Sequence, residues 1–346
     1  MIKNEYNRLK SCIVGREFSL SPKMFDISFK TFFKNNLEDL DYVQELSQYY
    51  TSEKIHERNE DLDNLAKVIE SFGVKVYRPS EVDKIIKIKT PTFESICRPS
   101  SNVRDQCLIY ENTIFETAPN LRGRYFENYT LYNIFSTLYK NGMNWIQCPK
   151  SNLTDESIDI DDWRAERDFT NIPSQYEMFF DSANCLKLND DILYNYSTYN
   201  HYLGIKWLKD NVSANIIPVR VTDNHIDGNI ISLREGTLLV NDKKLKTKIG
   251  DLLPRKFKEY EFLRLPSDVI MEDEVADKDV PKLASREGMS INIFSIDEKT
   301  VIVNECDVPV CELLDRNGFN VIPVKLRHCR MFGGGIHCST LDIERE

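Results

Sequence analysis

One cysteine near the end of the chain stands in a setting that suits a reactive thiol. Residues 333–335 are three consecutive glycines, and Ile336 and His337 separate them from Cys338. Glycines lack a Cβ and let a ligand approach closely, and the apolar and β-branched residues after Cys338 indicate a short strand that would hold the sulfur. A cysteine attacks as the thiolate, so we predict a nucleophile here, although a cysteine taken alone is more often structural.

A histidine and several aspartates could complete this chemistry. His225 could accept the thiol proton and later donate one to a leaving amine. Asp227 lies two residues further on, so on a strand the two side chains would share a face and the carboxylate could hold the imidazole in one tautomer. Asp105 and Asp181 stand outside any metal motif and suit a planar cation with paired N–H groups, such as a guanidinium. The alternatives are turn or cap roles for the aspartates and a surface or core role for the histidine.

The cysteines and histidines show neither a disulfide framework nor a metal motif. There are nine cysteines, an odd number without dense spacing, which favours reduced thiols in a cytosolic protein. Residues 328–329 and 337–338 are two His-Cys pairs, but no CxxC or HxxxH spacing supports a zinc site. We therefore expect no metal site.

Composition narrows the class of protein and of partner. Hydrophobic residues make up 41% and charged residues 29% of the 346, the balance of a globular protein. No apolar run is long enough for a membrane span or a signal-peptide core, so we expect a cytoplasmic protein without membrane contact. A net charge of −10 without a basic cluster argues against nucleic-acid binding and would attract cationic small molecules.

The elements that must position these side chains recur along the chain. Two strands joined by a tight polar turn are predicted four times, with the second strands at 111–116, 190–195, 235–241 and 298–304. Helical spacing is predicted at 62–72, 125–140, 201–209 and 310–316, each ending at Gly or Asn. Further strands then follow at 74–79, 145–149, 215–219 and 320–324.

This order predicts a repeated ββαβ unit, with four full units and a split fifth. In the fifth, the strand near Cys338 would pair with residues 9–14. The units open at Asp105, Asp181, His225 and Cys338, so these side chains would converge on one axis. Residues 19–56 and 150–176 interrupt the pattern and are predicted insertions, either an active-site lid or solvated packing. An ordinary α/β sandwich is the alternative fold.

Four stretches carry a resemblance to a known family. They are residues 180–184 (FDSAN), 202–207 (YLGIKW), 225–227 (HID) and 333–342 (GGGIHCSTLD). The chain resembles the amidinotransferase family, the glycine and inosamine-phosphate amidinotransferases, from about residue 85 to the C-terminus and in family order. The resemblance implies one domain over residues 1–346 with the fold of a five-bladed α/β-propeller.

The resemblance also implies an activity. Cys338 would attack the guanidino carbon of L-arginine, ornithine would leave, and an acceptor amine would take the amidino group from the sulfur. His225 resembles the family's acid and base, and Asp181 and Asp227 resemble the carboxylates that hold the guanidinium and orient the histidine. Asp105 matches an aspartate that contacts the donor. Small-molecule substrates without a cofactor are implied, natural-product biosynthesis is one setting, and a homodimer is compatible with the resemblance.

One departure from the family concerns donor recognition. Where the family carries an arginine that grips the donor carboxylate, this chain has Lys244, which can bind a carboxylate only as a point charge. Asn224 and Ser285 are further candidates for the substrate pocket. The acceptor amine is left open. The alternative functions are a guanidine-modifying hydrolase of the deiminase or dihydrolase type and an inactive guanidino-binding or regulatory protein.

Overall fold

The computed structural model describes residues 1–20, 24–31, 50–223, 225–242, 245, 247–266 and 289–346. In this part of the chain five three-stranded sheets are built alike: two strands form an antiparallel pair, and a third lies parallel to the central strand. The strands are β5 (Cys107–Tyr110), β6 (Thr113–Glu116) and β7 (Asn144–Gln147); β8 (Cys185–Leu188), β9 (Asp191–Asn195) and β10 (Asn215–Val219); β11 (Ile230–Arg234), β12 (Thr237–Val240) and β13 (Glu261–Arg264); β14 (Phe294–Ser295), β15 (Thr300–Asn304) and β16 (Asn320–Val324); and β17 (Thr340–Arg345), β1 (Leu9–Val14) and β2 (Lys75–Tyr77).

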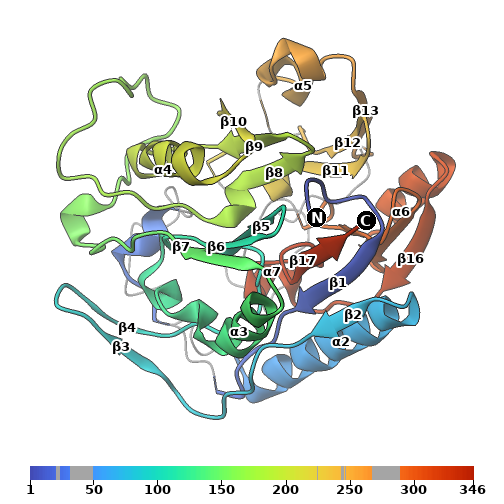
Figure 1. Ribbon diagram of the computed structural model, residues 1–346, viewed down its shortest axis with the longest axis horizontal. Helices are drawn as coiled ribbons and strands as arrows, with labels where there is room; N and C mark the ends of the chain where they lie inside the picture. The colour runs from blue at the N-terminus through green and yellow to red at the C-terminus, as the bar shows by residue number, and fades with distance from the viewer. Residues whose placement is uncertain (21–23, 32–49, 224, 243–244, 246, 267–288) are drawn as a thin grey trace.

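The sheets lie around the middle of the molecule as the blades of an α/β-propeller (Figure 1). The predicted fold is therefore confirmed, and the sandwich alternative is wrong. A sixth, two-stranded sheet, β3 (Lys87–Lys89) with β4 (Glu94–Ile96), lies outside the repeat.

The two ends of the chain complete the fifth blade together. β17 runs antiparallel to β1, with Val14 opposite Thr340 and Ile13 opposite Leu341. The N-terminal amine also donates to the backbone oxygen of Arg345. This pairing across the whole length of the chain confirms the prediction that the C-terminal strand closes onto residues 9–14.

In the part of the chain that the structure describes, four helices of nine or more residues connect the second and third strands of their blades. They are α2 (Ser52–Ser71), α3 (Tyr132–Lys140), α4 (Tyr199–Asn211) and α6 (Val308–Arg316). The side chains of Thr51 and Thr198 accept from backbone N–H groups in the first turns of α2 and α4, as N-caps do. Positive φ angles at the glycines after α2, α3 and α6 end these helices where the sequence predicted.

Two of the predicted helix boundaries need correction. α2 begins at Ser52 rather than Leu62, so residues 52–56 of the predicted insertion at 19–56 belong to this helix. Residues 125–140 begin with a 3₁₀ segment, and α3 starts only at Tyr132.

The third blade uses short turns in place of a long helix. The shorter helical segments are η1 (Ile27–Thr31), η3 (Arg122–Arg124), η4 (Glu127–Leu131), η5 (Asp155–Ser157), η6 (Ser182–Asn184), η7 (Ile226–Gly228), α5 (Ile249–Leu252), η8 (Arg255–Phe257) and α7 (Cys329–Phe332).

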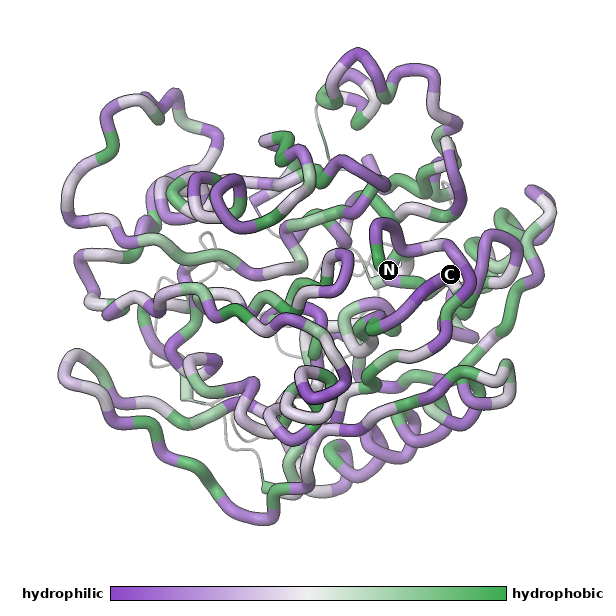
Figure 2. Tube along the Cα trace, in the orientation of Figure 1, coloured by the Kyte–Doolittle hydropathy of each residue, from purple (hydrophilic) through white to green (hydrophobic). Residues whose placement is uncertain are grey.

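The hydrophobic core lies between neighbouring blades and under the helices. One cluster joins Ile13 of β1, Ile109 of β5 and Leu341 of β17 to Phe135 of α3. Figure 2 shows hydrophilic and hydrophobic stretches alternating along α2, as expected of a helix with one buried face. No helix of the described residues is long and apolar enough to cross a membrane.

Candidate active site

The side chains predicted to converge lie in the turns that lead into the first strands of their blades. Asp105 precedes β5, and Asp181 stands before η6, which leads into β8. His225 stands before η7 and β11, and Cys338 lies in the turn before β17. The hydrogen bonds and charge interactions described below link all four, so the structure brings these predicted residues into one site.

Asp181 and His225 form a buried pair. Nε2 of His225 lies 2.8 Å from Oδ2 of Asp181, and the amide of Gln106 donates to Oδ1 at 2.6 Å. Asp181 is fully buried, whereas 17% of the His225 side chain is exposed. The carboxylate therefore holds the imidazole by one nitrogen while the ring reaches solvent.

The pKa of His225 follows from these neighbours. Burial lowers it, but the charge of Asp105, the hydrogen bond and charge of Asp181 and the charge of Asp227 outweigh burial and raise the pKa to about 9. A ring that is protonated at neutral pH can act as a general acid.

The prediction that Asp227 orients His225 from the same strand is wrong. Residues 226–228 form the turn η7 and the strand begins only at Ile230, so the period-two argument does not apply. The carboxylate of Asp181 bonds the His225 ring, and the carboxylate of Asp227 contacts the side chains of His337 and Cys338.

Cys338 is held by an asparagine and an aspartate. Its backbone N–H donates to Oδ1 of Asn292 at 2.9 Å, and Nδ2 of Asn292 donates to the sulfur at 3.2 Å. The thiol lies 3.3 Å from Oδ2 of Asp227. The residue is 3% exposed. Burial, followed by the negative charges of Asp227 and Asp105, holds the pKa of the thiol well above its ordinary value.

Two of the three glycines, Gly334 and Gly335, pack closely against other side chains, contrary to the expectation that the glycines admit a ligand to the sulfur. Gly333 ends α7 with a φ of +67°. A Cβ on Gly334 would lie 2.2 Å from the amide oxygen of Asn102, and one on Gly335 would lie 2.8 Å from Asn292. The last contact matters most, because Asn292 holds Cys338.

A buried arginine of α2 supports this loop from behind. Nη2 of Arg58 donates to the carbonyl oxygen of Gly334 at 2.9 Å and to the hydroxyl of Ser339 at 2.8 Å. The Arg58 guanidinium also lies 5.8 Å from the ring centre of Phe332. The cation thereby ties the residues on both sides of the cysteine to α2.

Asp105 presents an acceptor that lacks a partner. Its Oδ2 accepts from Arg124 at 2.7 Å, but its buried Oδ1 has no hydrogen-bond partner within the described residues. Burial raises the pKa of Asp105. A buried carboxylate oxygen without a donor is unfavourable, and a bound cation with N–H groups would satisfy it.

Three of the predicted substrate residues, Asn224, Lys244 and Ser285, lie outside the described residues. Sequence reasoning also missed side chains that the structure places in the site, namely Glu5, Gln106, Arg124, Asn292 and His337. Asn292 could have been predicted from the repeat, because it precedes the first strand of the fourth blade, as the predicted residues precede the first strands of the other blades.

The arrangement supplies a thiol, an acid and base, and carboxylates for a planar cation. No group of three or more His, Cys, Asp or Glu side chains is placed to hold a metal ion in the part of the chain that the structure describes. An arrangement of these groups can support nucleophilic attack by sulfur with proton transfer through an imidazole.

The packing of Gly335 can be tested by adding a methyl group. We expect Gly335→Ala to destabilise the fold by about 1–3 kcal/mol and to slow alkylation of Cys338 by iodoacetamide, because the Cβ displaces Asn292 and its donation to the sulfur. Thermal unfolding and peptide mass spectrometry measure the two effects. Gly250→Ala, whose Cβ would meet only Phe262 ring atoms at 3.4 Å or more, is the control. Unchanged alkylation in Gly335→Ala would contradict the packing argument.

The charge partners of His225 can be tested by titration. We expect its ring to titrate near pH 9, and about 1 to 3 pH units lower in Asp181→Asn, because the variant removes the negative charge that favours the protonated ring. NMR of labelled histidine gives both values once the His225 signal is assigned with His225→Asn. Asp251→Asn removes an exposed carboxylate and serves as the control. A His225 titration that does not move in Asp181→Asn would rule out this pairing.

Comparison with known proteins identifies the family. A scan against models of protein families gave no match. Inosamine-phosphate amidinotransferase 1 of Streptomyces griseus is 30% identical over 349 residues, covering 99% of this chain and 96% of that protein. L-arginine:L-lysine amidinotransferase of Pseudomonas savastanoi pv. phaseolicola is 26% identical over 304 residues, covering 86% of this chain and 81% of that protein.

Solved structures agree on the fold. Inosamine-phosphate amidinotransferase StrB1 of Streptomyces griseus matches with a TM-score of 0.85 at 27% identity, over 99% of this chain and 96% of that chain. DDAH of Pseudomonas aeruginosa, in complex with citrulline, shares only the fold, with a TM-score of 0.58 at 13% identity over 97% of this chain and 99% of that chain. The 30% identity, which extends over almost the whole of both chains, shows that this chain belongs to the amidinotransferase family and is an amidino-transferring enzyme.

Proposed function

We propose that this enzyme moves the amidino group of L-arginine to an acceptor amine through a covalent amidino-cysteine on Cys338, with release of ornithine. The observation that carries the proposal is a thiol beside one carboxylate, with a separate His–Asp pair and an unpartnered carboxylate oxygen in the same site. A relative named L-arginine:L-lysine amidinotransferase supports arginine as the donor.

The carboxylates account for binding of the guanidinium. The free Oδ1 of Asp105 can accept one N–H of a planar cation. Among the described residues, the hydrogen bonds of Asp227 to Asn292, His337 and Cys338 use Oδ2, and its Oδ1 can accept a second N–H. Two carboxylates of a buried site thus gain a cation that offsets their charge.

Binding of that cation also prepares the nucleophile. In the free enzyme the pKa of the Cys338 thiol is raised by burial and then by the charges of Asp227 and Asp105. A guanidinium placed against these two carboxylates offsets their charge, and therefore favours loss of the thiol proton to solvent when the substrate is present, while His225 keeps its own proton for the leaving nitrogen.

Two side chains, Cys338 and His225, carry the steps of the proposed reaction. The Cys338 thiolate attacks the guanidino carbon, forming a C–S bond, and the C–N bond to the ornithine nitrogen breaks as His225 gives that nitrogen a proton. An acceptor amine next attacks the same carbon and passes a proton to His225. The C–S bond then breaks and regenerates the thiolate, so the kinetics are ping-pong.

A direct assay tests the proposal. We expect incubation with arginine to add one amidino group to the wild-type enzyme in intact-mass spectra, and we expect a panel of amines, including glycine, lysine and aminocyclitol phosphates, to give ornithine and one guanidinylated product. Cys338→Ala and Cys338→Ser should give no adduct, whereas Cys306→Ser, which changes an exposed cysteine, should behave as wild type.

Two outcomes would overturn parts of this proposal. An adduct that persists in Cys338→Ser would exclude this residue as the nucleophile. Citrulline or ammonia formed without dependence on an amine would replace transfer by hydrolysis, the reaction type of the alternative function.

Lys244 is our candidate for the donor carboxylate, on the strength of its place in the sequence. We expect Lys244→Ala to raise KM for arginine roughly 10- to 100-fold with kcat little changed, the loss expected for one charge-assisted hydrogen bond. Steady-state kinetics measure both constants, and Lys243→Ala is the matched control. An unchanged KM would mean that another residue binds the carboxylate.

A further inference from the structure

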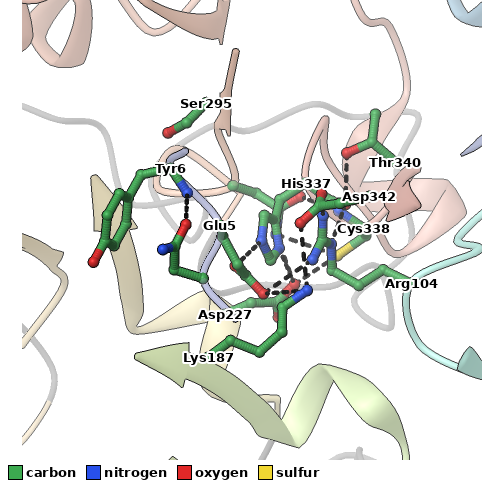
Figure 3. A network of polar contacts seen from close by, with 12 residues as sticks. Glu5, Tyr6, Arg104, Lys187, Asp227, Ser295, His337, Cys338, Thr340 and Asp342 are labelled. Atoms are coloured by element: carbon green, nitrogen blue, oxygen red, sulfur yellow. Dashed lines mark hydrogen bonds and ion pairs between the residues drawn. The ribbon is translucent and has the colours of Figure 1, made fainter. Parts of the chain in front are cut away.

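His337, the residue before the nucleophile, lies between two carboxylates (Figure 3). Nδ1 lies 2.9 Å from Oδ2 of Asp227, and Nε2 lies 2.9 Å from Oε2 of Glu5. An ionised carboxylate can only accept, so both ring nitrogens must carry a proton to satisfy both contacts. The geometry therefore describes an imidazolium, and the ring is almost fully buried.

Glu5 reaches this place because the first residues of the chain are fixed across two blades. Ile2 forms a β-bridge with Glu111, and Asn4 forms one with Leu188. Between these anchors and β1, the Glu5 side chain enters the interior and is 5% exposed. The N-terminal segment thus delivers a buried carboxylate to the far nitrogen of the His337 ring.

The charged side chains near His337 form one connected cluster. Those facing it directly are Glu5 from the N-terminal segment, Arg104 from the turn before β5 and Asp227 from η7. The charged side chains behind them are Lys187 of β8 and Asp342 and Arg345 of β17. Three carboxylates meet three cations and the imidazolium. The carboxylate of Asp105, whose negative charge also acts on the Cys338 thiol, balances the remaining positive charge, so without the imidazolium these groups would carry one excess negative charge before the thiol ionises.

The same ring also fixes the acceptor beside the thiol. Oδ2 of Asp227 accepts from Nδ1 of His337, lies 3.3 Å from Nδ2 of Asn292 and lies 3.3 Å from the Cys338 sulfur. A neutral imidazole could donate to only one of its two carboxylates, and the other would then be left without this donor.

We propose that His337 is a positioning residue: held as an imidazolium between Glu5 and Asp227, it fixes the carboxylate beside the thiol and supplies the positive charge that offsets the thiolate. This inference rests on the proposed role of Cys338 as the nucleophile. In this proposal Glu5, which lies far from Cys338 in the sequence, affects the chemistry of the thiol through its contact with His337.

His337→Asn separates charge from hydrogen bonding, because an asparagine amide can still donate to Asp227 but carries no charge. We measure the rate at which iodoacetamide alkylates Cys338 as a function of pH, by mass spectrometry of the peptide that contains it. We expect the profile of His337→Asn to move to higher pH by about one unit, so that alkylation at a fixed pH on its rising limb is about tenfold slower. His328→Asn removes a peripheral His–Glu pair and is the matched control.

A second variant tests the route from Glu5. Glu5→Gln keeps an acceptor for Nε2 but removes the charge that favours the imidazolium, and we expect its profile to move in the same direction. Because Glu5 acts through His337, the double variant should be no slower than His337→Asn alone. Additive effects would overturn that route, and a folded His337→Asn with the wild-type profile would overturn the whole inference.

The alkylation measurement needs no substrate, so it separates this inference from the proposed function. If the wild-type enzyme forms no amidino adduct with arginine, the proposed function fails. The dependence of the thiol on His337 is still decided by the pH profile.

Discussion

The structure depends on the buried guanidinium of Arg104, which joins the first blade to both ends of the chain. Nη1 donates to Glu5 at 3.1 Å, and Nη2 donates to Asp342 at 2.9 Å. Nε and the backbone N–H of the same residue donate to the carbonyl oxygens of His337 and Cys338. The planar fork of arginine can make these bonds at once, whereas a lysine could not. Cys338, the proposed nucleophile, is therefore placed by a contact that forms only when the ring of blades closes.

Burial of the Arg104 guanidinium costs free energy, and this cost determines which groups must surround it. Burying a cation is strongly unfavourable unless its charge and its N–H groups are satisfied. The same requirement applies to Asp342, whose pKa is kept well below its usual range by Arg345, Lys187 and Arg104 despite burial. The interior near the cysteine is thus a polar network in which each member needs the others. The loop with the three glycines packs closely against Asn102 and Asn292, so it has little freedom to adapt.

The sequence predicted the parts of this design that are local or repeated. Hairpins, helix ends and the pairing of residues 9–14 with the C-terminal strand follow from alternation, turn residues and the recurrence of one unit. The residues that precede the first strand of each blade were predicted from the same repeat. Applying the repeat to the fourth blade would also have predicted Asn292 as a site residue. Glu5 and His337 were not predicted as site residues, because their role depends on contacts between residues 332 positions apart. The prediction for Asp227 was wrong because residues 226–228 form the turn η7, and two residues in a turn do not share a face as they do on a strand.

The separation of the two carboxylates has a chemical consequence. Asp181 bonds the ring of His225, and Asp227 contacts the thiol of Cys338, so the proposed proton donor and the proposed nucleophile do not share one acceptor. The pKa of His225 is raised by its carboxylates, which keeps the acid charged. The pKa of the thiol is raised as well, by burial and by the neighbouring charges, which keeps the nucleophile protonated until a cation arrives. A resting enzyme of this kind holds both protons and avoids a buried thiolate beside carboxylates. A cation that binds against Asp105 and Asp227 relieves the negative charge next to the thiol, while the bond between Asp181 and His225 is untouched. The substrate itself would then decide when the sulfur becomes reactive.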